Sequence, residues 1–459
     1  MAKYQIYQDK AETHNIWIKS IPREWKIVPL KYMCSGFVKD GPHETPKFID
    51  EGIPFLSVDG IQNNKLVFEG CRYISIEDDV RFSLKCKPRK GNILLGKAAS
   101  VGKVAFVEND NDFNVWSPLA VINPKDIRLG RFIFYCLQSY ELQLQCDVFS
   151  NSNTQKNLGM TTIDNLSFPY PSINEAEKIS DFLDQETAKI DSLIAKQVKL
   201  IELLKEKRQA VISHAVTKGL NPNVPMKDSG VEWLGEVPEH WRICRLKHVG
   251  YIQSGIAKGK DLTGKTSISV PMLRVANVQD GYLNLDEVHQ IDIEPEQLER
   301  YLLQNGDVLM NEGGDNDKLG RGAVWRNEIK NCIHQNHVFA IRTTVIEPEW
   351  LDILTRASYA KFHFFRQSKQ STNLASISAT NIKETPILVP PNNEREQILG
   401  YLNRQFNQFS KLENRCYQQV ELLKERRTAL ISAAVTGKID VRHWQNPNKN
   451  KEADTELSA

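Results

Sequence analysis

Two stretches of the chain, each about forty residues long, carry apolar residues in alternating steps of four and three. This spacing is a heptad repeat, typical of helices that bury one stripe against a partner helix. Proline-rich sequence followed by Asn-Glu, at 168–175 and 389–394, marks the start of each helix. The apolar positions are Ile179, Leu183, Ile190, Leu193, Leu200, Leu204 and Val211 in the first helix, and Ile398, Leu402, Phe409, Leu412, Leu423 and Leu430 in the second.

Polar residues interrupt both stripes, and such residues tend to fix the register and the partner of a helix pair. They are Glu186, Gln197 and Lys207 in the first helix and Gln405, Gln419 and Arg426 in the second. Helices of this length normally need a partner, so we expect an antiparallel pair within the chain. The alternative is two separate helices, each packed on its own domain. About forty residues at ~1.5 Å each would form a rod of about 60 Å.

The remaining sequence carries short alternating apolar runs, such as 104–107 and 338–341, broken by Gly, Asn and Pro. These runs predict strands in two mixed globules, and the fold class is therefore α+β. We divide the chain into a lead (1–16), a first globule (17–168), a helical region (169–221), a second globule (222–388), a second helical region (389–441) and a tail (442–459). The lead and the tail are expected to be poorly ordered.

The chain is a tandem duplication. Trp17, Ile21, Pro22, Trp25, Leu30 and Lys31 recur as Trp233, Val237, Pro238, Trp241, Leu246 and Lys247. The helix ends 202–217 and 421–436 share about twelve of their sixteen positions, far more than common helix propensity would produce. With the order globule, helix, globule, helix, antiparallel packing would place one globule at each end of the rod and relate the halves by a pseudo-twofold axis.

Composition adds little that is specific. Lys and Arg number 59 against 57 Asp and Glu, so any affinity for nucleic acid must come from local clusters. The eight cysteines form no Cys-x-x-Cys pair, which favours reduced thiols in a cytoplasmic protein. No stretch is apolar enough to predict a membrane span or a signal segment.

Three motifs resemble catalytic or metal sites, and none is complete. The segment 91–98 has the Gly and Lys spacing of a phosphate loop, but Ala98 replaces the hydroxyl that binds Mg²⁺, and the intervening residues favour a strand. His43-Glu44 lacks the cysteines of a deaminase zinc site. His334 and His337 lie in an alternating apolar stretch, where strand packing is a better explanation than metal ligation. We therefore predict no catalytic residues and no metal site.

Polar loops occur at corresponding places in both copies: 39–45 and 254–260, 96–103 and 317–321, and 150–156 and 367–373. Their cations and backbone amides suit phosphate, and their amide side chains suit base edges. A solvated turn explains any one of these loops better, but their recurrence in both copies favours a shared ligand. The candidate DNA-binding residues are Lys39, His43, Thr45, Lys97, Lys103, Asn151, Asn153, Gln155, Lys156, Lys258, Lys260, Lys318, Arg321, Gln367, Lys369, Gln370, Thr372 and Asn373.

With its Pro-Arg-Glu-Trp and Pro-Glu-His-Trp openings, the segment 40–46 and the nearly identical helix ends, the duplicated unit resembles the specificity subunit of type I restriction-modification enzymes. The resemblance implies a non-catalytic subunit whose globules are target-recognition domains, each reading one half of a bipartite site in double-stranded DNA. It implies that the helices act as a ruler and dock two methyltransferase subunits, which translocase-endonuclease subunits then join. S-adenosylmethionine, ATP and Mg²⁺ would belong to those partners. We expect the docking surface to include Glu202, Lys205, Arg208, Glu421, Lys424 and Arg427.

Two other functions remain open at this point. One is a fused enzyme that both recognises and methylates DNA, which the lack of a cofactor loop disfavours. The other is a coiled-coil scaffold that binds proteins and not DNA. Steep salt dependence of duplex binding would distinguish a recognition subunit from such a scaffold.

Overall fold

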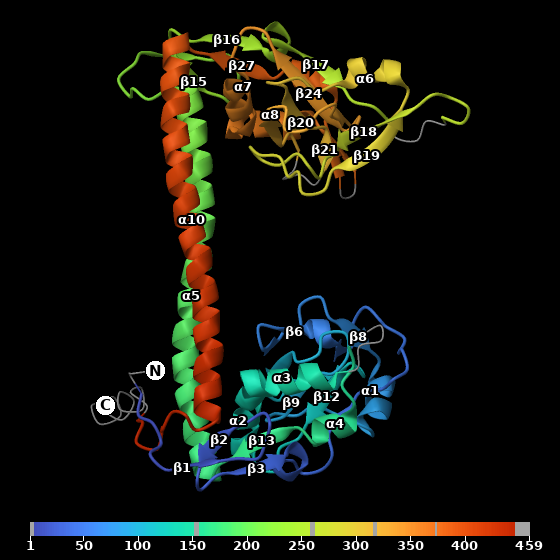
Figure 1. Cartoon of the computed structure of the whole chain (residues 1–459), viewed down its shortest axis with the longest axis vertical. Helices are drawn as coiled ribbons and strands as arrows, with labels where there is room; N and C mark the ends of the chain where they lie inside the picture. Colours follow the sequence, from blue (N-terminus) through green and yellow to red (C-terminus); the bar gives the residue numbers. More distant parts are fainter. Residues whose placement is uncertain (1–3, 151–155, 258–261, 315–318, 372–373, 446–459) are drawn as a thin grey trace. The chain divides into compact units, whose positions relative to one another are not determined.

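The structure is a computed structural model that describes residues 4–150, 156–257, 262–314, 319–371 and 374–445. It forms two compact units, one of residues 1–198 and 417–459 and the other of residues 199–416. Each unit holds one globule of strands and helices together with one part of each long helix (Figure 1). The α+β fold class predicted from the sequence is confirmed.

The first globule is built on two sheets. An antiparallel four-stranded sheet has the order β10-β9-β12-β4 (Val104–Phe106, Ile93–Gly96, Leu119–Ile122, Lys39–Asp40). A three-stranded sheet has the order β11-β5-β8 (Asn114–Val115, Ile53–Leu56, Arg72–Ile74), with β11 parallel and β8 antiparallel to β5.

The second globule repeats both sheets. Its four-stranded sheet has the order β22-β20-β24-β17 (Gly322–Val324, Val308–Asn311, Val338–Thr343, Gly250–Ser254). Its three-stranded sheet has the order β23-β18-β19 (Ile333–His334, Ile268–Leu273, His289–Ile293), again with one parallel and one antiparallel pair. The duplication seen in the sequence is therefore a duplication of strand order and direction.

The four-stranded sheet of the first globule is buried on both faces. Ile93 and Leu95 of β9 pack in one hydrophobic cluster with α2 (Ile127–Gln138), whereas Leu94 packs in a second cluster with Leu56. This division follows from the period of two along a strand. Because both faces are covered, all four residues of β9 are buried, and the prediction that the residues between Gly91 and Gly96 favour a strand is confirmed.

Short helices surround the sheets in each globule. They are α1 (Ile76–Ser83), α2, α3 (Tyr140–Phe149) and α4 (Met160–Asp164) in the first, and α6 (Pro295–Tyr301), α7 (Pro348–Arg356), α8 (Ser358–Gln367) and α9 (Ala379–Lys383) in the second. A two-stranded pair closes each globule before its long helix: β13 (Ser167–Tyr170) with β3 (Lys26–Pro29), and β27 (Pro386–Val389) with β16 (Arg242–Arg245).

The long helices are α5 (Ile173–Lys218, 46 residues) and α10 (Asn392–Val435, 44 residues). In the first unit Arg427 of α10 donates from Nε to Asp191 of α5 at 2.9 Å. In the second unit the guanidinium of Arg208 lies 4.7 Å from the centre of the Phe406 ring. An early residue of one helix thus meets a late residue of the other in each unit, and the predicted antiparallel pairing is confirmed (Figure 1).

The lead was expected to be poorly ordered, and for residues 4–16 this is wrong. Strand β1 (Lys10–Glu12) pairs with β2 (Ser20–Pro22), as β14 (Met226–Asp228) pairs with β15 (Glu236–Pro238) in the second copy. Tyr7 is buried in the core of the first unit. The lead is therefore part of the repeat. The lead packs against the first unit because the aromatic ring of Tyr7 adds a large apolar surface to the core.

The tail also contributes where the structure describes it. The Trp444 ring packs at 5.7 Å from the ring of Phe182 in α5. The expectation of poor order is thus wrong for residues 442–445, and the rest of the tail, 446–459, lies outside the described residues.

The buried stripe of the helices differs from the predicted one in their middle sections. Leu193, Leu200 and Leu412 are 45%, 42% and 43% exposed, whereas Ile201 is only 6% exposed. The sequence places two apolar residues side by side at 193–194 and 200–201, so spacing alone does not determine which of them is buried.

The polar residues predicted to lie in the buried stripe also differ in their burial. Glu186, Gln197 and Gln405 are half-buried as expected, but Lys207, Gln419 and Arg426 are exposed. Arg208 and Arg427, each one residue after a predicted position, are half-buried instead.

The corrected stripe predicts unequal effects of two neighbouring substitutions. We expect Ile201→Ala to lower the free energy of unfolding by about 2–4 kcal/mol, because it leaves a cavity at a buried position. Leu200→Ala, at an exposed position, should cost less than about 1 kcal/mol. Urea denaturation followed by circular dichroism measures both. Equal losses, or a larger loss for Leu200→Ala, would contradict the corrected register.

Candidate nucleic-acid interface

Two loops of the first globule, and the segment that follows the third loop, meet at one end of its four-stranded sheet. Strand β9 ends at Gly96, and the ammonium of the next residue, Lys97, lies 3.2 Å from a carboxylate oxygen of Asp40 in the first loop. The amide of Leu158 donates to the carbonyl of Lys97 at 2.8 Å, directly after the third loop. Segments that are far apart in the sequence are thus joined around one residue.

The second globule has the same junction around Glu312. The Glu312 amide donates to the carbonyl of His337 at 2.9 Å, as the Lys97 amide donates to the carbonyl of Pro118 at 2.9 Å. The Ile377 amide donates to the carbonyl of Glu312 at 2.9 Å, which repeats the bond from Leu158. Lys97 and Glu312 are therefore equivalent positions that carry opposite charges.

The second loop of each globule closes in the same way. The Gly96 amide donates to the carbonyl of Lys103 at 2.7 Å, and the Asn311 amide donates to the carbonyl of Arg321 at 2.9 Å. Lys103 and Arg321, both predicted to contact phosphate, therefore occupy equivalent places.

A glycine fixes the first loop in each copy. A side chain at Gly41 would place its Cβ 1.9 Å from the carbonyl oxygen of Val115, and one at Gly255 would place it 2.1 Å from that of His334. Any side chain at these positions would force the strands apart. Both first loops thus begin pressed against the three-stranded sheet.

Asp40 is the centre of a charged cluster at this junction. Its carboxylate, 5% exposed, lies 2.6 Å from the ammonium of Lys85, 3.2 Å from that of Lys97 and 3.1 Å from Nε2 of His43. Burial tends to raise the pKa of this carboxyl, but hydrogen bonds from Lys85 and Lys97 outweigh it and leave the pKa below its ordinary value.

Lys97 itself is only 8% exposed, which corrects its expected placement on the loop surface. The Lys97 ammonium forms an ion pair with Asp40, so Lys97 stabilises the loop from its buried side. Asp40 and Lys85 are not among the residues predicted from the sequence, because their pairing depends on strand packing. A glycine at the start of both first loops, Gly41 in the first copy, could have pointed to Asp40, since Asp40 directly precedes it.

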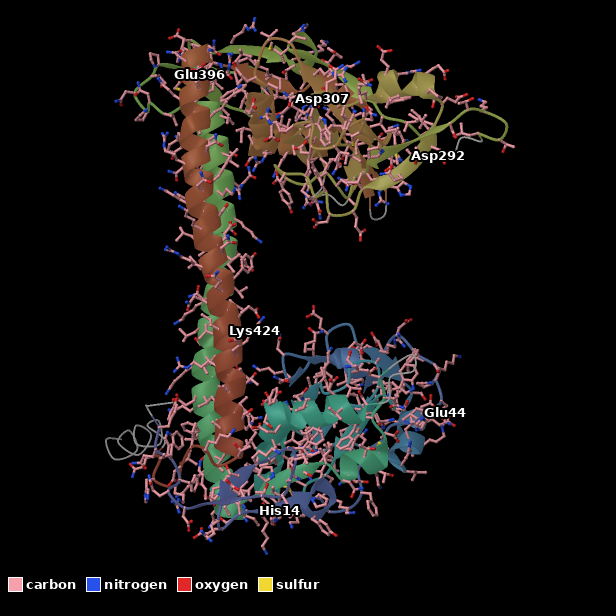
Figure 2. All side chains as sticks on the ribbon, in the orientation of Figure 1. His14, Glu44, Asp292, Asp307, Glu396 and Lys424 are labelled. Atoms are coloured by element: carbon pink, nitrogen blue, oxygen red, sulfur yellow. The ribbon has the colours of Figure 1, made fainter. Side chains whose placement is uncertain are left out.

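The other candidates of the first globule lie on the surface. Lys39, His43, Thr45 and Lys103 are exposed, and exposed Lys156 forms an ion pair with Asp147 of α3. Nearby Glu44, labelled in Figure 2, pairs with Arg81 of α1.

In the second globule, Lys369 and Gln370 are exposed in β25 (Lys369–Ser371), and Gln367 and Arg321 are half-buried. The structure brings this strand to the junction through β26 (Leu374–Ser376), which pairs with both β25 and β21 (Gly313–Gly314). The predicted residues Asn151, Asn153, Gln155, Lys258, Lys260, Lys318, Thr372 and Asn373 lie outside the described residues.

The two histidines of the segment 334–337 have separate roles. His334 is fully buried in β23, where Nδ1 lies 2.6 Å from the carbonyl oxygen of Val338, and burial lowers its pKa. The strand-packing interpretation of His334 is confirmed. His337 is exposed and its Nδ1 lies 2.8 Å from Glu312. Among the residues that the structure describes, no group of His, Cys, Asp and Glu side chains is placed to hold a metal ion.

The predicted docking residues divide by exposure. Glu202, Lys205, Glu421 and Lys424 are exposed, and Figure 2 shows Lys424 projecting from α10. Arg208 and Arg427 do not lie on the exposed face, which corrects their expected position. Arg427 bonds Asp191 and the side-chain carbonyl of Gln138, each at 2.9 Å. Within the described segments, no helix is long and apolar enough to cross a bilayer.

The duplicated globules, paired helices and equivalent loop junctions define a two-module recognition protein. The family model "Type I restriction modification DNA specificity domain" matches residues 22–203 and 238–422, one match in each copy. These matches cover most of the chain, which therefore belongs to the type I restriction-modification specificity family. Specificity subunits recognise the DNA sequence and are the non-catalytic component of these enzymes.

The relatives reported next are distant but span most of the chain. The EcoKI specificity subunit of Escherichia coli (strain K12) is 21% identical over 93% of this chain and 92% of its own length. The MjaIX specificity subunit of Methanocaldococcus jannaschii is 22% identical over 96% of this chain and 99% of its own length. A solved structure described as "complex assembly and conformational transition of the type I R-M system" has a TM-score of 0.65 at 16% identity and covers 91% and 99%. It supports the fold.

The cluster around Asp40 predicts a pH-dependent contribution to stability. We expect Asp40→Asn to lower the free energy of unfolding at pH 7 by about 2–4 kcal/mol, because it leaves the buried Lys97 without its counter-charge. A lowered carboxyl pKa stabilises the fold above about pH 4, and this contribution is lost as the pH falls through the folded pKa.

The difference between the wild type and Asp40→Asn should therefore shrink below about pH 4, as measured by denaturation across a pH series. Asp50→Asn, at an exposed carboxyl, is the control and should change little. A constant difference between wild type and Asp40→Asn at all pH values would argue against the ion-pair explanation.

Proposed function

We propose that each globule of this specificity subunit reads one half of a bipartite target in double-stranded DNA, and that the long helices set the gap between the halves. The observation that carries the proposal is the loop junction, which is the same around Lys97 and around Glu312. Two equivalent binding frames on one chain suit two short half-sites. The loops of the two copies differ in their side chains, which suits half-sites of different sequence.

Cations of the loops supply the contacts to phosphate. Lys39, Lys103 and Lys156 serve the first half-site, and Arg321 and Lys369 serve the second. Gln367 and Gln370 carry amides of the kind that read adenine in the major groove.

The helix pair supplies the docking surface for two methyltransferase subunits, which translocase-endonuclease subunits join. The support is that the segments 202–217 and 421–436 are the most similar parts of the two copies, as two identical partners would require. Exposed Glu202 and Lys205 of α5 correspond in the repeat to exposed Glu421 and Lys424 of α10. S-adenosylmethionine, ATP and Mg²⁺ then act in the partners.

Exchange of a globule tests whether each globule reads its own half-site independently of the other. Replacing residues 17–168 with the corresponding globule of a relative should alter one half-site and leave the gap and the other half-site intact, because the second loop junction is untouched. Sequencing of methylated sites in the host gives the result. A change in both half-sites would count against the proposal.

Insertion of one heptad into α5 or α10 is the complementary change. It preserves the buried stripe but lengthens that helix by about 10 Å, roughly three base pairs of rise. The bases of both half-sites should stay the same, and only the gap should change, with reduced activity where the rotation between the half-sites no longer fits.

Salt dependence tests the phosphate contacts and distinguishes a DNA reader from a protein scaffold. We expect Lys103→Met to lower the slope of log affinity against log salt by about one unit and to leave the sequence preference intact. Lys26→Met, at an exposed lysine of β3 outside the loops, is the matched control and should keep the wild-type slope. If the wild-type protein bound duplex with no salt dependence, the scaffold alternative would be favoured.

A further inference from the structure

The second loop of the first globule contains an unusual backbone conformation. Five non-glycine residues have a positive φ in the described part of the chain, and four of them are asparagines (Asn63, Asn64, Asn327 and Asn331). Asparagine tolerates this conformation because its short polar side chain can bond locally. The fifth is Ala99, with a φ of 62° and an exposed side chain. Alanine has no such compensation.

The fold holds Ala99 in this conformation from both sides. The Ser100 amide donates to the carbonyl of Ala98 at 2.7 Å, which makes Ala99 the centre of a tight turn. The side chain of Gln143 in α3 donates to the carbonyl of Gly102 at 2.9 Å and anchors the far end of the loop. A strained residue persists when its surroundings determine it in this way.

Glycine would fit this turn without strain, so the alanine methyl is retained at a cost in stability. What the methyl adds is one small apolar group at the exposed tip of the loop, four residues before the phosphate candidate Lys103. A small apolar side chain is the kind of group that contacts the 5-methyl of thymine in the major groove.

We propose that Ala99 is a specificity-determining residue whose methyl group contacts the 5-methyl of a thymine in the half-site read by the first globule. The inference rests on the proposed function, namely that this globule binds a half-site. The geometry of the loop then assigns one side chain to one chemical feature of the DNA.

The test combines a protein change with a base change. The half-sites are first read from methylated sites in the host, and each thymine of the target duplex is then replaced in turn by deoxyuridine, which lacks only the methyl. We expect wild-type protein to lose about fourfold in affinity at one thymine of the first half-site, the value of one methyl contact. The Ala99→Gly protein should bind the normal duplex about fourfold more weakly and lose nothing further with deoxyuridine.

Stability provides an independent readout. Ala99→Gly should raise Tm by about 2–4 °C, because it relieves the strained turn. Asn64→Gly, also at a positive φ of 60° but outside the three loops, is the matched control. It should leave both the affinity and the deoxyuridine effect as in the wild type.

The outcomes separate the two proposals. If the wild type binds the target but is indifferent to deoxyuridine at every thymine, or if Ala99→Gly keeps the full deoxyuridine loss, the role of Ala99 is wrong and the half-site proposal stands. If the wild-type protein shows no preference for its target over other duplex, both are overturned.

Discussion

The fold depends on the need of two long helices to bury their apolar stripes. Neither α5 nor α10 has enough apolar surface around it to be stable alone in water, so each requires the other. Antiparallel pairing meets this need and also determines which parts of the chain form each unit. The first unit is completed by residues 417–459, which belong to the second copy of the repeat.

The contacts between globules and helices show the same exchange. In the first unit, the Tyr140 amide donates to the hydroxyl of Ser432, a residue of α10, at 2.8 Å. In the second unit, the Ser358 amide donates to the hydroxyl of Ser213, a residue of α5, at 2.9 Å. Each globule is thus held by the end of the helix that follows the other globule. The buried faces of both helix ends are therefore constrained by the same kind of contact with a globule.

Much of this architecture could be predicted from the sequence, because repeats and periodicity are properties of residue type. The duplication, the strand at 93–96 and the helix pair are of this kind. The register of the helix pair could not be predicted from the sequence, since Leu193 and Ile194 are both apolar and only packing shows which of them is buried. The ion pair of Lys97 and Asp40 could not be predicted either, because it depends on the order of strands in a sheet.

The two loop junctions share one set of backbone bonds but carry different side chains. The backbone bonds around Lys97 and Glu312 are the same, and so is the glycine that presses each first loop against its sheet. The side chains differ: Lys97 pairs with Asp40, whereas Glu312 lies 2.8 Å from a ring nitrogen of His337. Because each charged side chain has a polar partner within its own globule, the side chains of the loop surface can change without loss of the shared backbone bonds. The loop side chains can therefore diverge between the copies while the strands and helices that position them remain the same.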